Sequence, residues 1–303
     1  MFPAYFPMDT TKRCLVCIVF LVNCATFALI CSAMLSQEWV VVKPVRTGLN
    51  ISIRNVEYLD SETNRFQGVI YFGLFEGKKI LNYGFGNRAF DLKIVCVSKL
   101  KTCMYSSKEN STERVKDLHD NFNIYTKRGD KNFTDDEEAF KESLPDFNSW
   151  VVTISSLSLA AMFAITGGVF AIVNAIRNSA ELVFGFLGIG IWNTFGAICS
   201  MVSFLSWILL YLQKFRKNVM TREELDQHWV SEYRACVGYS FYLVVVSMFL
   251  FLLNVALIST IIKQPWVDRK LRSELRKKLS SGKYVAHSPA SSLAKKSKDI
   301  IAV

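Results

Sequence analysis

The chain has 303 residues and a net charge of +10, and hydrophobic residues make up 51% of it. All of its acidic and basic residues lie outside four long uncharged stretches. A helix on the surface of a soluble protein carries a polar face, so this distribution excludes an ordinary soluble globular protein.

The four uncharged stretches are long enough to cross a bilayer, which takes about 20 helical residues. We expect membrane-spanning helices at residues 14–35, 150–176, 182–212 and 236–262. The first stretch is longer than the apolar core of a cleavable signal peptide, so we expect an uncleaved anchor. The segments outside the spans are the N-terminus (1–13), a large loop (36–149), a short turn (177–181), a second loop (213–235) and the tail (263–303).

Charge and glycosylation motifs predict the same orientation. Most of the positive excess lies in the tail, whereas the large loop carries equal numbers of acidic and basic residues. Positive residues resist translocation, so we expect both termini in the cytosol and both loops outside the cell. The large loop also holds three Asn-x-Ser/Thr motifs, which predict glycosylation at Asn50, Asn110 and Asn132.

Six of the eight cysteines fall in the expected spans, namely Cys14, Cys17, Cys24, Cys31, Cys199 and Cys236. The other two, Cys96 and Cys103, lie in the large loop, where an exposed pair in an oxidising compartment usually forms a disulfide. Cys14 and Cys17 lie near the cytosolic end of the first span. They either pack as small apolar side chains or carry S-palmitoyl groups.

Several segments of the large loop have strand-like composition. Candidate strands are residues 40–42, 51–53, 65–75 and 94–97. Four glycines, at positions 73, 77, 84 and 86, are expected at turns or close backbone approaches, with a partner-binding turn as the alternative. Residues 106–142 are polar and include the acidic run 135–138, which lacks the ligand spacing of a calcium loop and indicates a solvated face.

The expected spans contain no ionisable side chains, which removes the usual basis for ion-coupled transport and voltage sensing. Their asparagines are expected to form hydrogen bonds between helices; they are Asn23, Asn174, Asn193 and Asn254. Small residues such as Ala160, Ala164, Gly167 and Gly168 allow close helix packing, within one bundle or between molecules.

The tail predicts contacts with lipid and protein. Apolar residues recur every four positions from Val267 to Leu279, and the basic residues between them are Arg269, Lys270, Arg272, Arg276, Lys277 and Lys278. This pattern indicates an amphipathic helix on the anionic inner leaflet, or a topology signal alone. The last residues, with Ile301 and Val303, fit a PDZ groove, although short apolar ends also arise by chance. A tail held at the membrane makes a nucleic-acid partner implausible.

No catalytic constellation is evident in the sequence. The three histidines, at positions 119, 228 and 287, are isolated in different segments, and no phosphate loop, zinc spacing or nucleophile motif is present. We therefore expect neither an enzyme nor a cofactor or metal site.

The most specific motifs are Phe72-Gly-Leu-Phe-Glu-Gly77 and Tyr83-Gly-Phe-Gly-Asn-Arg88, preceded by Trp39 after the first span. Asn174-Ala175 ends the second span, and Gly185 to Asn193 opens the third. Together these segments resemble the clarins, within the claudin-like superfamily. The matching residues are Trp39, Gly73, Leu74, Phe75, Gly77, Gly84, Gly86, Arg88, Asn174, Gly185, Gly188, Trp192 and Asn193.

The resemblance implies a membrane four-helix bundle with a small antiparallel β-sheet in the first extracellular loop. Two departures accompany it. The two clarin loop cysteines are absent, their places being taken by Val45 or Arg46 and by Tyr83, and Cys96 with Cys103 can substitute for them. A polar insertion at about residues 91–144 makes the loop roughly 40 residues longer than a typical clarin loop.

The resemblance further implies a non-enzymatic organiser of the plasma membrane in sensory cells, linked to actin-rich protrusions and acting through lateral and scaffold contacts. Expected partners are anionic lipids, other membrane proteins or further copies of the chain, and a PDZ or actin-linked scaffold. An auxiliary subunit of an ion channel, or a claudin-like junction component, is the alternative.

Overall fold

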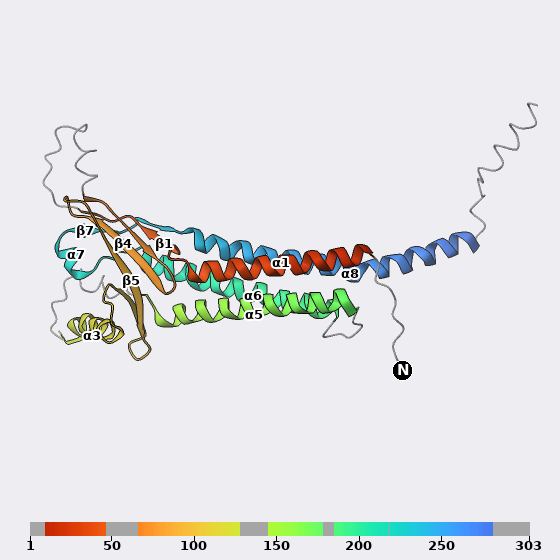
Figure 1. Ribbon diagram of the computed structural model, residues 1–303, viewed down its shortest axis with the longest axis horizontal. Helices are drawn as coiled ribbons and strands as arrows, with labels where there is room; N and C mark the ends of the chain where they lie inside the picture. Colours follow the sequence, from red (N-terminus) through yellow and green to blue (C-terminus); the bar gives the residue numbers. More distant parts are fainter. Residues whose placement is uncertain (1–9, 47–65, 128–144, 178–184, 218, 281–303) are drawn as a thin grey trace, which may run out of the picture. The chain divides into compact units, whose positions relative to one another are not determined.

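The computed structural model describes residues 10–46, 66–127, 145–177, 185–217 and 219–280. It divides into two compact units, Met1–Ile258 and Ser259–Val303. The first unit contains a helical bundle and, at one end of it, a β-sheet (Figure 1).

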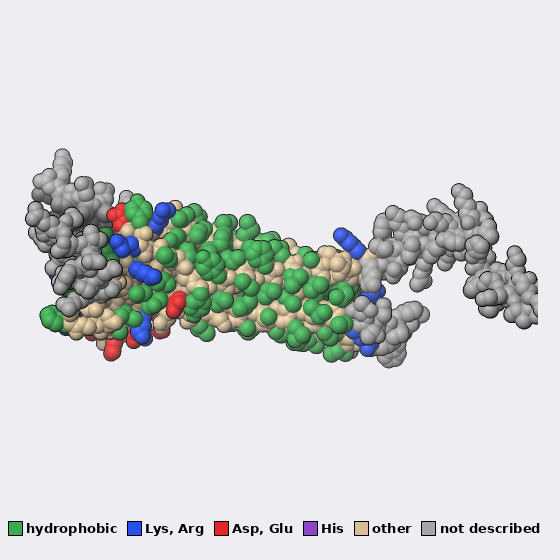
Figure 2. Space-filling view, turned by 90° about the horizontal axis from the view of Figure 1, so that it is seen from above, with side chains coloured by type: hydrophobic (Ala, Val, Ile, Leu, Met, Phe, Trp, Pro, Cys, Tyr) green, Lys and Arg blue, Asp and Glu red, His purple; other side chains and the backbone are tan. Residues whose placement is uncertain are grey.

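Within the described residues, four helices are long and apolar enough to cross a membrane. They are α1 (Thr10–Leu35), α5 (Phe147–Arg177), α6 (Phe186–Leu210, continued by the π-helical turn η3, Tyr211–Phe215) and α8 (Tyr239–Ser280). Most of each apolar window faces outward, and hydrophobic side chains cover the middle of the bundle (Figure 2). An outward apolar surface of this extent requires lipid around it. The chain is therefore a multi-pass membrane protein.

Six antiparallel strands form the main sheet, in the order β6-β5-β4-β3-β1-β8. Their bounds are β1 Val40–Val42, β3 Gly68–Phe72, β4 Glu76–Asn82, β5 Asn87–Val97, β6 Thr102–Ser106 and β8 Ala235–Val237. A second pair joins β2 (Val45–Arg46) to β7 (Trp229–Val230). Strands β7 and β8 belong to the second loop, so the two loops build one sheet structure together.

Two further helices flank the sheet: α3 (Ser111–Lys127) and α7 (Arg222–Asp226). We call the sheet, the β2–β7 pair, α3, α7 and their connections the loop domain. With the four long helices it makes the claudin-like fold that the family resemblance implied.

The strands differ in extent from the sequence expectation. The candidate strand at 65–75 shortens to β3, and the one at 94–97 is the end of the much longer β5. The candidate at 51–53 and the acidic run at 135–138 lie outside the described residues. The fourth long helix begins at Tyr239 because residues 235–237 pair with β1, which places Cys236 in a strand and not in a span.

The polar insertion contains a packed helix, α3. Leu118 of α3 is fully buried against Val95 of β5 and Met104 of β6. Val115, Leu118, Phe122 and Tyr125 recur at helical spacing, but the polar composition of residues 106–142 as a whole concealed this pattern.

Candidate interaction site in the loop domain

Gly73 brings the β3–β4 turn against the end of α1. Its N–H donates to the Glu76 carbonyl at 2.9 Å. A side chain at this position would place its Cβ 2.5 Å from both the Glu76 and the Ser36 carbonyl oxygens. Real Cβ atoms do not come so close to backbone, so only glycine fits this approach of sheet to helix.

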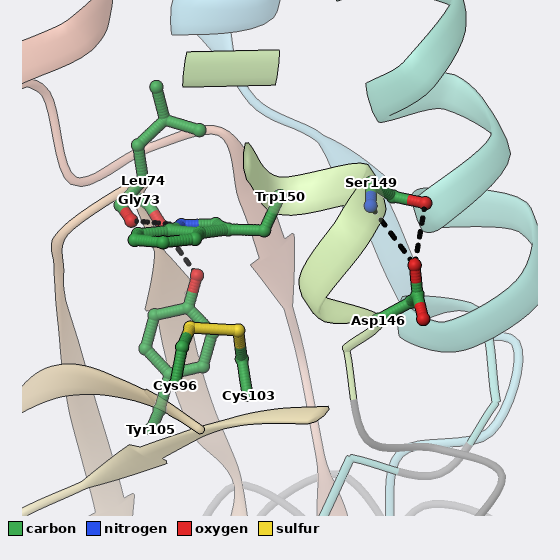
Figure 3. Close-up of a disulfide and its surroundings, with 8 residues drawn as sticks. All are labelled: Gly73, Leu74, Cys96, Cys103, Tyr105, Asp146, Ser149 and Trp150. Carbon is green, nitrogen blue, oxygen red and sulfur yellow. Dashed lines mark hydrogen bonds between the residues drawn. A yellow bond between two sulfur atoms is a disulfide. The ribbon is translucent and has the colours of Figure 1, made fainter. Parts of the chain in front are cut away.

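The carbonyl groups of this turn are held by two aromatic donors (Figure 3). The Trp150 indole N–H donates to the Leu74 carbonyl at 2.8 Å, and the Tyr105 hydroxyl donates to the Gly73 carbonyl. Leu74 is fully buried, and the Phe75 ring meets the Trp150 ring edge-on at 6.5 Å. Burial raises the pKa of Tyr105 far above its usual range, so its phenol stays protonated and remains a donor.

Trp39 makes the matching contact on the other side of the junction. Its indole N–H donates to the Ala33 carbonyl at 2.6 Å, and its ring meets the Trp207 ring edge-on at 4.9 Å. The side chain is fully buried. Trp39, Gly73 and Leu74 are thus fold-determining residues that fix the sheet on the bundle, and not a binding surface.

A disulfide joins Cys96 of β5 to Cys103 of β6, with 4.1 Å between their Cα atoms. The two residues are direct cross-strand partners in the sheet. The bond lies beside Tyr105, two residues further along β6 (Figure 3). The disulfide therefore cross-links the β5–β6 hairpin, and Tyr105 of this hairpin donates the hydrogen bond to the Gly73 carbonyl.

The second half of the family signature builds a different feature, the turn between β4 and β5. Gly84 and Gly86 have φ angles of +98° and +115°, which side chains rarely adopt. The Asn82 side-chain oxygen accepts hydrogen bonds from both glycine N–H groups, at 2.9 and 3.3 Å. Between the glycines, Phe85 is 99% exposed.

Three side chains pack against one another behind this turn. The Arg88 guanidinium sits 5.9 Å from the centre of the Tyr83 ring, which in turn meets the Trp229 ring edge-on at 5.7 Å. Trp229 is fully buried. Partial burial and the nearby Glu224 raise the pKa of Tyr83. The turn projects the Phe85 ring into solvent, and no sequence pattern distinguishes Phe85 from its neighbours.

A cleft of about 350 Å³ opens between the sheet, α3 and α7. Three apolar side chains contribute to its lining, Phe90, Leu92 and Met104, although most of the exposed lining is polar. Polar side chains from both loops line its rim; they are Ser106, Ser107, Lys108, Asp117, Thr221, Glu223 and Gln227. A smaller cavity of about 60 Å³ shares several of these lining residues and continues toward Phe215.

The cleft is closed at one side by an ion pair between Lys79 of β4 and Glu224 of α7. Both side chains are largely buried, and the other Glu224 oxygen accepts the Thr221 N–H at 3.0 Å. Glu224 therefore caps the start of α7 and ties it to the sheet at the same time. The pair holds the two loops together, so it belongs to the frame of the cleft.

The signature residues of the spans serve helix packing. The Asn254 amide of α8 donates to the Asn193 side-chain oxygen of α6 at 2.9 Å, which is the expected bond between helices. Asn23 and Asn174 each donate to the carbonyl four residues before them, at Val19 and Phe170.

The remaining span residues of the signature lie at the start of α6 or beside α5. Trp192 stacks on Phe163 of α5 with 5.7 Å between ring centres. Gly185 precedes the first turn of α6, and Gly188 is buried within that helix.

Other predicted sites remain predictions. Cys14 and Cys17 are exposed free thiols near the start of α1, and Asn110 is exposed just before α3. Asn50, Asn132, Ile301 and Val303 lie outside the described residues. The backbone of the basic segment is helical up to Ser280, although its side chains are outside the description. Among the described residues, no group of three or more His, Cys, Asp or Glu side chains could hold a metal ion.

A model of the Clarin-2-like family matches residues 11–107, from α1 through β6. This part of the chain is similar to the clarins. No curated protein sequence matches the chain significantly. The match includes the junction residues Trp39, Gly73 and Leu74 and the exposed Phe85 turn, and it ends before α3.

Proposed function

We propose that this chain is a clarin-type, non-enzymatic organiser of the plasma membrane, with both termini in the cytosol. The observation that carries the proposal is the loop domain: strands from both loops join in its sheets, and its surface offers a cleft and a projecting aromatic side chain. A preformed surface of this kind binds with little loss of conformational entropy.

The other parts of the chain fit the same role. The spans expected from the sequence carry no Asp, Glu, Lys, Arg or His, and Asn193 and Asn254 serve to join two helices. We propose that the tail contacts the anionic inner leaflet through its basic residues and a PDZ scaffold through Ile301 and Val303, which would link the protein to actin. Support of sensory cells is the corresponding cellular role, as the family implies.

Purification of the full chain from its own tissue in mild detergent tests this function. We expect adhesion and cytoskeletal proteins together with the chain. A stoichiometric channel would instead identify an auxiliary subunit, and recovery of the chain without other proteins would contradict the organiser role.

A truncation separates the scaffold contact from the loop contacts. Deleting Val303 should remove a PDZ scaffold from the purified material and leave loop partners in place. Ala302→Ser is the matched control, because alternate side chains of an added strand face away from the groove. Unchanged scaffold recovery after the deletion would rule out the terminal motif.

A further inference from the structure

Phe85 and the cleft are complementary in chemistry. A fully exposed aromatic side chain on a tight, hydrogen-bonded turn has two features of an interface anchor: large apolar area and few rotatable bonds. The lining of the cleft is mainly polar but includes Phe90 and Met104, both of which make favourable contacts with a phenyl ring. Its volume lies at the lower end of ligand pockets, which span roughly 300–1,000 Å³.

The charges around the two features also match. Arg88 follows Phe85 by three residues and its side chain is exposed. On the cleft rim, Glu223 of α7 is exposed and is distinct from Glu224, which Lys79 already neutralises. If Phe85 of one molecule entered the cleft of another beside α7, Arg88 of the first would come close to Glu223 of the second. Lys108 also lines the cleft and would repel Arg88 if Phe85 entered in the opposite orientation.

We propose that the occupant of the cleft is the Phe85 turn of a second copy of this chain. Phe85 does not fill its own cleft, since its side chain is almost entirely in solvent and does not line the cleft. Tyr83, two residues away, lines that cleft, so anchor and cleft are neighbours on one surface. Neighbouring complementary features allow two copies to exchange anchors reciprocally, which gives a closed two-fold dimer.

The proposal deepens the proposed function, because it names one lateral contact through which the organiser would cluster. The two proposals can be contradicted independently. If copies of the chain do not contact each other, the tissue partners and the tail scaffold can still co-purify with it. If those partners are not recovered, the dimer can still form.

Photocrosslinking of the full chain tests the contact directly. p-Benzoylphenylalanine replaces Phe85, and two differently tagged forms are expressed together and irradiated in membranes. We expect a crosslinked species that carries both tags, with the adduct on the peptide that contains Met104 (residues 102–107). The same replacement at Tyr233, an exposed aromatic residue of the second loop, is the control and should give no such species. An adduct on another protein alone, or a dimer crosslinked elsewhere, would overturn the proposal.

A charge swap provides a second readout that does not depend on the crosslinker. Arg88→Glu and Glu223→Arg should each lower the dimer fraction of the purified chain in nanodiscs about tenfold, and the double variant should restore most of it. Because Arg88 also packs on the Tyr83 ring of its own chain, thermal unfolding is measured for every variant, and only variants that unfold cooperatively are compared. Single variants with an unchanged dimer fraction, or a double variant no better than the singles, would contradict the contact.

Discussion

At the scale of single residues, the segments that resemble the clarins have two structural roles. Trp39, Gly73 and Leu74 fix the sheet to the bundle, and all are enclosed by other parts of the chain. Gly84 and Gly86 instead permit a turn with positive φ angles that displays Phe85. Motif resemblance alone treats these residues as equivalent, whereas their burial separates those needed for folding from those available to a partner.

Gly73→Ala should destabilise the protein by about 1–3 kcal/mol or more, because the new methyl group would lie 2.5 Å from two carbonyl oxygens. Thermal unfolding in detergent measures the effect. Gly190→Ala is the matched control: its Cβ would meet only Ile258 at 3.4 Å, and alanine favours the helix. Equal melting temperatures for the two variants would refute the close approach at Gly73.

Tyr105→Phe removes one hydrogen bond to the Gly73 carbonyl and should cost about 1 kcal/mol near neutral pH. The difference should shrink at alkaline pH. In the folded protein the pKa of Tyr105 is raised above its ordinary value of 10.0, so the stability that the protonated phenol contributes is complete below pH 10 and is lost as pH rises further. Melting temperatures of both proteins between pH 8 and 11 test this, and a gap that stays constant would contradict it.

At the scale of elements, sequence patterns predicted the long helices well and the sheet only in part. A stretch of twenty or more uncharged residues that crosses a bilayer forms a helix, because the helix satisfies all backbone hydrogen bonds within the segment. Strands β7 and β8 are two and three residues long, and their partners lie almost 200 residues earlier in the chain. No local pattern encodes such pairing, so the second loop looked like a plain connection.

Leu118→Ala should cost about 2–5 kcal/mol of local stability, because the side chain is fully buried between α3 and the sheet. Hydrogen exchange of residues 111–120 should become faster, while exchange in β4 and β5 stays slow. Lys116→Ala, on the exposed opposite face of the same helix, is the control and should leave exchange unchanged. Similar exchange in both variants would show that α3 does not depend on this contact.

Asn254→Leu removes the amide bond between α8 and α6 and should destabilise the bundle by about 0.6–1.7 kcal/mol, the range of hydrogen bonds between membrane helices. Denaturation in mixed micelles provides the measurement. Leu253→Ala alters a neighbouring side chain that faces outward and should have little effect. A larger loss for Leu253→Ala than for Asn254→Leu would argue against the helix-joining role.

At the scale of the whole molecule, the orientation in the membrane is a prediction from charge and glycosylation motifs. Asn→Gln replacement at positions 50, 110 and 132 should abolish the mobility shift that glycosidase treatment produces in the natural chain. Each single replacement should remove part of the shift. A natural chain whose mobility does not respond to glycosidase would favour the opposite orientation.

The binding surface could not be derived from the sequence, for a physical reason. The cleft forms where β4, β5 and β6 of one loop meet α7 of the other, so its lining comes from positions more than 100 residues apart. The buried pair of Lys79 and Glu224 shows the same separation. Individually these residues read as ordinary surface charges, and only the folded arrangement reveals that they share a site.

The pairing of β8 with β1 also sets an order of events during synthesis. Strand β1 follows the first span, whereas β8 immediately precedes the last. The edge of β1 that pairs with β8 therefore stays unpaired until the ribosome has synthesised the second loop. A chain truncated before residue 235 would retain this open edge permanently, and we expect it to be held by chaperones or to aggregate.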